Sequence, residues 1–157
     1  MPNREATSAK QSLGIDRLIL QIHDASFPSD PDEDWGRGSP YSRGADRFFE
    51  FAERLGFDAI QLGPQGLTQR GNPSPYDATL FSRNPLNLPL RRLVEQKRIR
   101  RETLTRLVAQ HRSDSPETEV SHRELHDRFQ SVLDEVIAGA TAADRAAARD
   151  FIERNEY

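Results

Sequence analysis

The sequence predicts an α/β protein in which a strand–helix–strand unit is followed by a purely helical region. Two short apolar runs, 18–22 and 57–62, are rich in branched residues and flank a stretch with helical periodicity. Eight of the ten prolines lie between Pro28 and Pro89, and seven of the nine glycines lie between Gly36 and Gly71. This change of composition near residue 90 separates strands and long loops from helices.

The two apolar runs are the predicted strands of a parallel pair. Gly56 follows the intervening helical stretch at the position of a left-handed C-cap. In a βαβ unit the functional loops lie beyond the carboxyl ends of the strands, so we expect function in the loops that begin at His23 and Gly63. The helical stretch is marked by four apolar residues: Phe48, Phe51, Ala52 and Leu55.

The region after residue 90 predicts three helices. The first has an apolar face at Leu104, Leu107 and Val108. Ser121 and Glu124 have the spacing of a capping box, which predicts the start of a second helix. The second helix carries an apolar stripe at Leu125, Phe129, Val132, Leu133, Val136 and Ile137.

Thr141 and Asp144 predict the cap of a third helix, with Ala147, Ala148, Phe151 and Ile152 facing inward. We therefore divide the chain into three segments. They are a polar N-terminal tail at 1–14, the first β/α units with a long loop at 15–90, and an all-helical subdomain at 91–157.

Composition excludes several classes of protein. The chain has 157 residues and no cysteine, which excludes a disulfide scaffold, a thiolate zinc site and a cysteine nucleophile. A net charge of −3 does not favour binding of nucleic acid through a basic field. No run of about 18 apolar residues predicts a membrane span, and the polar N-terminus lacks the apolar centre of a signal peptide. We expect a cytoplasmic protein with no membrane partner.

His23 is the first candidate site residue because it directly follows a predicted parallel strand. A histidine there can contact a substrate or transfer a proton. The alternative is that it bonds loop backbone and shapes the first turn. Neighbouring Asp24 and Ser26 are too close in sequence to form a catalytic triad with it.

His122 and His126 are four residues apart on a predicted helix, a spacing that can place two imidazoles on one metal ion. The zincin pattern needs a glutamate directly after the first histidine, and Arg123 stands there instead. A solvated helix face is the better interpretation, and we predict no metal site.

Six cations cluster between Arg91 and Arg101. They could contact nucleic acid, but no aromatic residue alternates with them and no helix-turn-helix pattern accompanies them. An exposed helical face balanced by Glu95 and Glu102 is the better interpretation, so we expect no nucleic-acid partner.

The loop from Gly63 to Pro89 is the most informative stretch. Pro73 and Pro75 hold the backbone extended around Ser74-Pro-Tyr76, which Asp77 follows, and Pro85 restricts Asn84. A tyrosine on a stiff loop above a strand end offers a sugar ring an apolar face and a hydroxyl group. The alternative is a tyrosine that only pins the loop to the strand ends.

Four motifs, in this order and spacing, carry a family resemblance: His23-Asp-Ala-Ser-Phe-Pro28, Gly63-Pro-Gln-Gly66, Ser74-Pro-Tyr76 and Asn84-Pro-Leu86. Together they resemble the N-terminal part of the 4-alpha-glucanotransferases, the amylomaltases or disproportionating enzymes of glycoside hydrolase family 77. The resemblance covers about residues 15 to 157. This sequence departs from the family where Asp24 replaces a proline and where 29–38 is longer and more acidic.

The resemblance implies a partial (β/α)8 TIM barrel, of which this chain supplies the first βαβ unit, since a whole barrel needs about 250 residues. It implies retaining transfer of α-1,4-glucan segments between maltooligosaccharides, without a cofactor or metal ion. The catalytic carboxylates of the family come from later strands, so no catalytic residue is assigned here and the chain alone is expected to be inactive.

The resemblance assigns substrate binding to Ser74 and Tyr76, and less directly to Asp77 and Asn84; His23 joins them through its place at the strand end. The expected partners are an α-1,4-glucan and, if the chain is a fragment, the remainder of the barrel. The alternative function is a noncatalytic glucan-binding or protein-interaction module.

Overall fold

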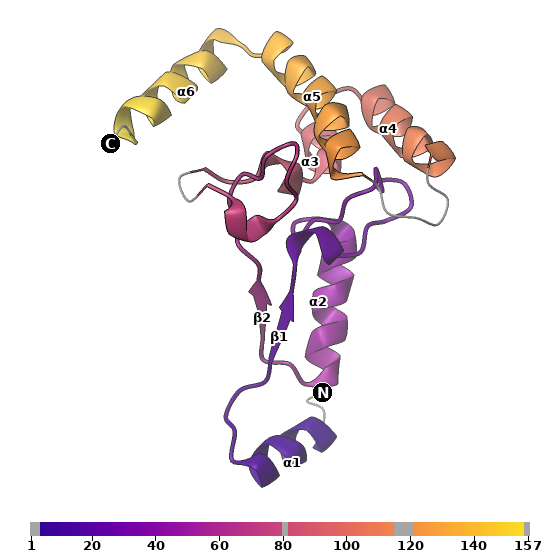
Figure 1. Ribbon diagram of the computed structural model, residues 1–157, viewed down its shortest axis with the longest axis vertical. Coiled ribbons are helices and arrows are strands. Elements are labelled where there is room, and N and C mark those ends of the chain that lie inside the picture. Colours follow the sequence, from indigo (N-terminus) through magenta and orange to yellow (C-terminus); the bar gives the residue numbers. More distant parts are fainter. Residues whose placement is uncertain (1–3, 80–81, 115–120, 156–157) are drawn as a thin grey trace.

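The computed structural model describes residues 4–79, 82–114 and 121–155. Two parallel strands and a helix form a stem, and further helices lie beyond the carboxyl ends of the strands (Figure 1). The first half contains α1 (Arg4–Leu13), β1 (Ile19–Ile22), η1 (Asp24–Ser26), α2 (Arg43–Leu55) and β2 (Ala59–Leu62). The second half contains η2 (Pro75–Asp77), η3 (Pro85–Asn87), α3 (Leu90–Glu95), α4 (Arg101–Asp114), α5 (His122–Ala138) and α6 (Ala142–Arg154).

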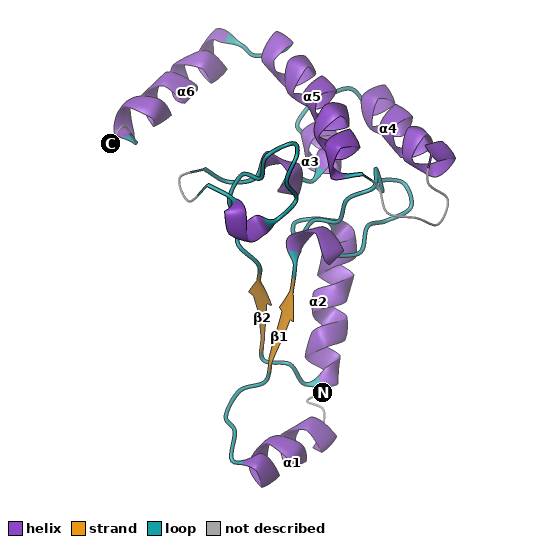
Figure 2. Ribbon diagram, viewed as in Figure 1, coloured by secondary structure: helices purple, strands orange, loops and turns teal. Residues whose placement is uncertain are grey.

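The predicted βαβ unit is confirmed. β1 and β2 pair in parallel, from Ile19 opposite Ala59 to Ile22 opposite Leu62. They are the two strands that the described residues contain, and both stand out in the stem of Figure 2. Every second side chain of both strands is exposed, so one face of the sheet is left uncovered.

The ends of α2 follow from local chemistry. Ser42 is its N-cap, and the Ser42 hydroxyl accepts a hydrogen bond from the backbone N–H of Ala45 at 3.1 Å. Gly56 ends the helix with a φ of 96°, and its N–H donates to the carbonyls of Ala52 and Glu53. Glycine adopts this left-handed conformation without steric cost, so the predicted C-cap is confirmed.

The main hydrophobic core lies among the helices and joins both halves of the chain. Trp35, from the loop before α2, and Leu86, from η3, are buried with residues of α3, α4 and α5. The Trp35 and Phe129 rings lie 6.0 Å apart between centroids. The helical members of this core are Leu90, Ile99, Leu104, Leu107, Val108, Leu125, Phe129 and Val132.

Residues 4–13, expected to be part of a polar tail, form α1. This helix is attached to the stem by Lys10, whose ammonium lies 2.8 Å from the Asp58 carboxylate. Asp58 also accepts a hydrogen bond from the backbone N–H of Leu18 at 2.8 Å. The Lys10 hydrogen bond lowers the pKa of Asp58.

Two expectations for the last helices are wrong. Ser121 precedes α5 but its side chain makes no capping hydrogen bond. Phe151 and Ile152 were expected to face inward, yet they are 63% and 56% exposed because α6 lies away from the helical core (Figure 1). The capping box of Thr141 with Asp144 is confirmed.

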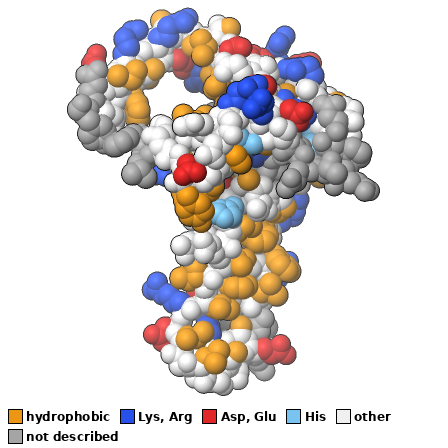
Figure 3. All heavy atoms as spheres, viewed as in Figure 1, with side chains coloured by type: hydrophobic (Ala, Val, Ile, Leu, Met, Phe, Trp, Pro, Cys, Tyr) orange, Lys and Arg blue, Asp and Glu red, His pale blue; other side chains and the backbone are white. Residues whose placement is uncertain are grey.

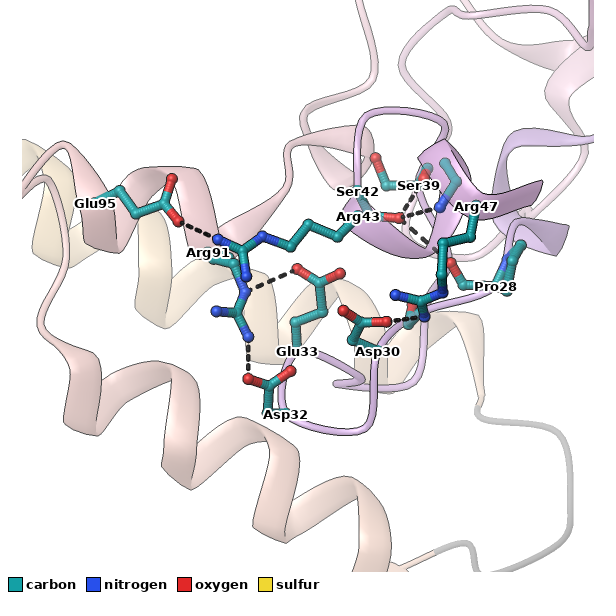
Figure 4. A network of polar contacts seen from close by, with 12 residues as sticks. Pro28, Asp30, Asp32, Glu33, Ser39, Ser42, Arg43, Arg47, Arg91 and Glu95 are labelled. Carbon is teal, nitrogen blue, oxygen red and sulfur yellow. Dashed lines mark hydrogen bonds and ion pairs between the residues drawn. The ribbon is translucent and has the colours of Figure 1, made fainter. Parts of the chain in front are cut away.

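The acidic loop, which we define as Asp30 to Asp34, connects the stem to the helices through ion pairs (Figure 4). Asp30 pairs with Arg47 of α2, and Arg91 of α3 pairs with both Asp32 and Glu33. These contacts lower the pKa values of Asp30 and Asp32.

Three of the six cations of the basic cluster at 91–101 form ion pairs with carboxylates among the described residues. Besides Arg91, Arg98 lies 2.8 Å from the Asp144 carboxylate and Arg100 lies 2.9 Å from that of Glu135. Charges already paired within the chain are less available to phosphates.

Candidate functional site

The candidate site lies at the carboxyl ends of β1 and β2, where His23 and Gly63 follow the strands. The long loop returns on itself at this point. The backbone N–H of Asn84 donates to the Gln65 carbonyl at 2.9 Å, and Gly66 forms an antiparallel bridge with Arg83. The start and the end of the loop therefore lie side by side above the strand ends.

The side chains of His23, after β1, and Tyr76, in the long loop after β2, lie next to each other above the strand ends. Their rings meet edge to face, with centroids 6.1 Å apart and planes at 89°. His23 packs over Gly63, where a Cβ atom would stand 2.7 Å from His23 Nδ1. Tyr76 is 69% exposed, so burial of its ring does not hold the loop in place. This geometry favours a binding surface over a loop anchor.

Two hollows lie near Tyr76, and both have Pro64 and Pro75 in their lining. One is a cavity of about 210 Å³ between the two strand-end loops. The other, of about 430 Å³, is bordered by Tyr76 and Arg83. The polar side chains that line the first cavity are His23, Asp24, Arg37, Thr68, Asn84 and Asn87.

A buried polar network forms the floor of the first cavity. The Asp24 carboxylate is 6% exposed and accepts hydrogen bonds from the side-chain amides of Gln65 and Asn87. Asn87 in turn accepts a hydrogen bond from Arg37 Nη2 at 2.9 Å. The Ser39 hydroxyl donates to the Asn87 carbonyl at 2.6 Å. The two strand-end loops are thereby tied together beneath the cavity.

Asn84 and Asp77, predicted to bind substrate, bond mainly within the loop. The Asn84 amide nitrogen donates to the Thr68 hydroxyl at 3.1 Å, and the Asn84 side-chain oxygen accepts from the backbone N–H of Leu86 at 3.1 Å. Asp77 accepts a hydrogen bond from the Asn72 amide at 3.1 Å. Asn84 still lines the cavity.

Ser74 lies at the N-terminal end of η2, and its side chain makes no capping hydrogen bond there. Its backbone N–H donates to the side-chain oxygen of Asn72 at 2.9 Å. Ser74 thus fixes the turn that presents Tyr76.

Sequence reasoning missed Arg37, Gln65 and Asn87 as site residues. Gln65 lies within the 63–66 motif and Asn87 directly follows the 84–86 motif, whereas Arg37 lies in the divergent segment 29–38. None of the three is at a position that periodicity or turn chemistry distinguishes. The available signal was Asp24 itself, because a carboxylate directly after a strand end needs partners once it is buried.

The loop is anchored to the helical region through α5. Arg70 makes a bidentate ion pair with Asp127, in which both N–O distances are 2.6 Å. His122 Nε2 lies 2.9 Å from the Gln69 carbonyl, to which it donates. The His122 and His126 rings are 4.7 Å apart, but the described residues contain no group of three metal-ligating side chains.

Burial lowers the pKa of His126 below its ordinary value of 6.5, and nearby His122, Arg37 and Arg70 act in the same direction against Asp127. Near neutral pH the histidine is uncharged in both folded and unfolded chains. As pH falls through about 6.5, the unfolded chain takes up a proton that the folded chain resists, so stability falls.

We therefore expect the free energy of unfolding to drop between about pH 7.5 and about pH 5.5, and to drop less in His126→Gln. Urea denaturation at the two pH values measures both changes. An equal loss in the two proteins would contradict this role of His126.

Among the described residues, no helix combines the length and the apolar character that crossing a membrane requires. In comparisons with known proteins, no family model, no curated protein and no solved structure matches this chain.

Proposed function

We propose that these residues form a glucan-binding part of a 4-alpha-glucanotransferase-like enzyme, as the first βαβ unit of a (β/α)8 barrel with a helical subdomain. The observation that carries the proposal is the exposed Tyr76 ring, set edge to face with His23 beside a polar cavity. Parallel strands whose functional loops lie at their carboxyl ends are the arrangement of such barrels.

The chemistry of this surface suits an uncharged sugar chain. An exposed aromatic ring stacks on the C–H face of a pyranose, while hydroxyl groups bond to polar side chains around it. The two hollows that share Pro64 and Pro75 in their lining give room for more than one sugar unit. No cofactor or metal ion is needed for this binding.

Tyr76→Ala is expected to weaken maltotriose binding at least tenfold, because loss of a stacked aromatic ring removes about 1.4 kcal/mol or more. Tyr76→Phe keeps the stacking face and should stay within a few-fold of the original protein. Isothermal titration calorimetry measures all three affinities.

Phe51→Ala serves as the control, because Phe51 is an exposed aromatic residue on α2 that does not line either hollow. Unchanged maltotriose affinity in Tyr76→Ala, or absence of binding in the original protein, would contradict the proposal.

We further propose that the 157 residues do not catalyse transfer by themselves. A retaining mechanism needs two carboxyl groups about 5 Å apart that flank the glycosidic bond. Among the described residues, Asp24 supplies the single carboxylate that lines the first cavity, so the pair that this mechanism needs is missing there. Incubation with maltotriose should yield neither glucose nor longer chains by chromatography, and turnover would refute this part.

A noncatalytic interaction module is the second candidate. It is favoured by the exposed apolar side chains on the stem (Figure 3), among them Leu13, Ile19, Phe51 and Leu55 at 72%, 49%, 48% and 44% exposure. In the barrel proposal, further strands cover this surface and pair with the open edges of the sheet. A stable monomer that binds maltotriose would favour the module.

A further inference from the structure

Two side chains of opposite charge from the first strand-end loop, Asp24 and Arg37, lie in the wall of the first cavity and are bridged by Asn87 from the second loop. Asn87 links them, since its side-chain oxygen accepts from Arg37 Nη2 at 2.9 Å and its side-chain nitrogen donates to Asp24. Arg37 and Asp24 both line the cavity. The guanidinium and the carboxylate thus face one space with a neutral amide between them.

The guanidinium of Arg37 is held in one orientation. Its Nε donates to the Leu86 carbonyl at 3.3 Å while its Nη2 donates to Asn87. Among the described residues these are its hydrogen bonds, which leaves Nη1 without an acceptor. Burial lowers the pKa of Arg37, and the nearby Asp24 charge opposes that shift. A planar donor that is fixed and partly desolvated binds an oxygen atom with little further loss of entropy.

Holding the loops together does not require these charges. Buried ion pairs seldom stabilise a fold more than apolar residues of the same size would, because removing both charges from water costs several kcal/mol. Ser39 already joins the two strand-end loops through an uncharged hydrogen bond to the Asn87 backbone. Uncharged bonds from Asn84 to Gln65 and from Gln65 to Gly63 hold the second loop in shape. A charge pair in a cavity wall is better explained by what enters the cavity.

We infer that Arg37 is a ligand-binding residue whose Nη1 donates to a sugar oxygen in the cavity, and that Asp24 neutralises it so that the cavity accepts uncharged sugars and rejects anions. This inference rests on the proposed glucan binding and adds the residue pair that sets selectivity. Without the Asp24 charge, Arg37 and His23 would make the same cavity attractive to phosphate.

The proposed exclusion of anions from the cavity is tested with inorganic phosphate. The result of this test does not depend on whether the protein binds glucans. The original protein should show no saturable phosphate binding by calorimetry. Asp24→Asn keeps an oxygen that can accept both amide hydrogen bonds but removes the charge. It should bind phosphate saturably, with an affinity at least tenfold above the upper limit that calorimetry sets for the original protein. Arg37→Lys combined with Asp24→Asn should lose much of that gain, since lysine lacks the planar fork.

The donor role is tested with maltotriose. In the original protein, the side-chain Nε–H resonance of Arg37 should shift on titration with maltotriose. Arg37→Lys should bind maltotriose at least fivefold more weakly than Arg92→Lys, a matched change at an exposed position of α3 that lines neither hollow. Trp35, the single tryptophan, reports through its fluorescence whether each variant is folded.

The outcomes separate the two proposals. Maltotriose binding that depends on Tyr76 but leaves the Arg37 resonance unmoved overturns the role of Arg37 alone. Phosphate affinity in the original protein equal to that of Asp24→Asn overturns the neutralisation. Absence of any maltotriose binding overturns the proposed function, while the phosphate measurements still decide the selectivity of the cavity.

Discussion

Replacing Leu107 by alanine is expected to lower the free energy of unfolding by about 2–5 kcal/mol. Leu107 has 0% exposure and lies in the core that α4 shares with α3, α5 and the loop residues Trp35 and Leu86. The change removes buried methyl groups and leaves a cavity that rigid neighbours fill only in part. Since small proteins have about 5–15 kcal/mol of stability, this loss is severe.

Guanidinium denaturation followed by Trp35 fluorescence measures the effect, because Trp35 packs on Phe129 within the same core. Leu13→Ala is the matched control: Leu13 is 72% exposed, and its truncation should change stability by less than about 0.5 kcal/mol. Similar losses in both variants would show that Leu107 is not in a packed core.

Replacing Gly66 by alanine is expected to disrupt the loop that presents Tyr76. A Cβ atom there would stand 2.0 Å from the Thr79 carbonyl oxygen, and this backbone atom can give way only if the loop moves. Overpacking of this kind costs about 1–3 kcal/mol. Maltotriose affinity should fall at least tenfold, because the movement separates Tyr76 from His23.

Gly71 gives the control within the same loop, since a Cβ atom there meets nothing within 4 Å. Gly71→Ala should leave stability and maltotriose affinity unchanged or slightly improved, because alanine restricts the unfolded chain. Calorimetric titration of the two variants tests the comparison. Equal affinities would mean that the loop tolerates movement at Gly66.

Local sequence rules predicted the βαβ unit well. The β1 and β2 runs, the α2 periodicity and the Gly56 cap each depend on residues close in the chain. The α6 cap was predictable for the same reason, but its burial was not, because packing depends on what lies opposite the helix. Amphipathic patterning alone could not show that Phe151 stays exposed.

The candidate site was predictable only in part. His23 and Tyr76 were found because a strand end and a proline-stiffened loop distinguish them. Arg37, Gln65 and Asn87 were not, since their contacts join residues up to 63 positions apart. Such partners are chosen by the folded geometry, and a single sequence does not encode their distance in any periodic signal.

The shared core of Trp35 and Leu86 with the helices also bears on how the chain unfolds. The composition boundary near residue 90 passes through this core, so the two segments are not independent folding units. Their unfolding should be cooperative, with the cavity and the helices lost in one transition. A ligand in the cavity would then protect the helices from proteolysis, although it touches none of them.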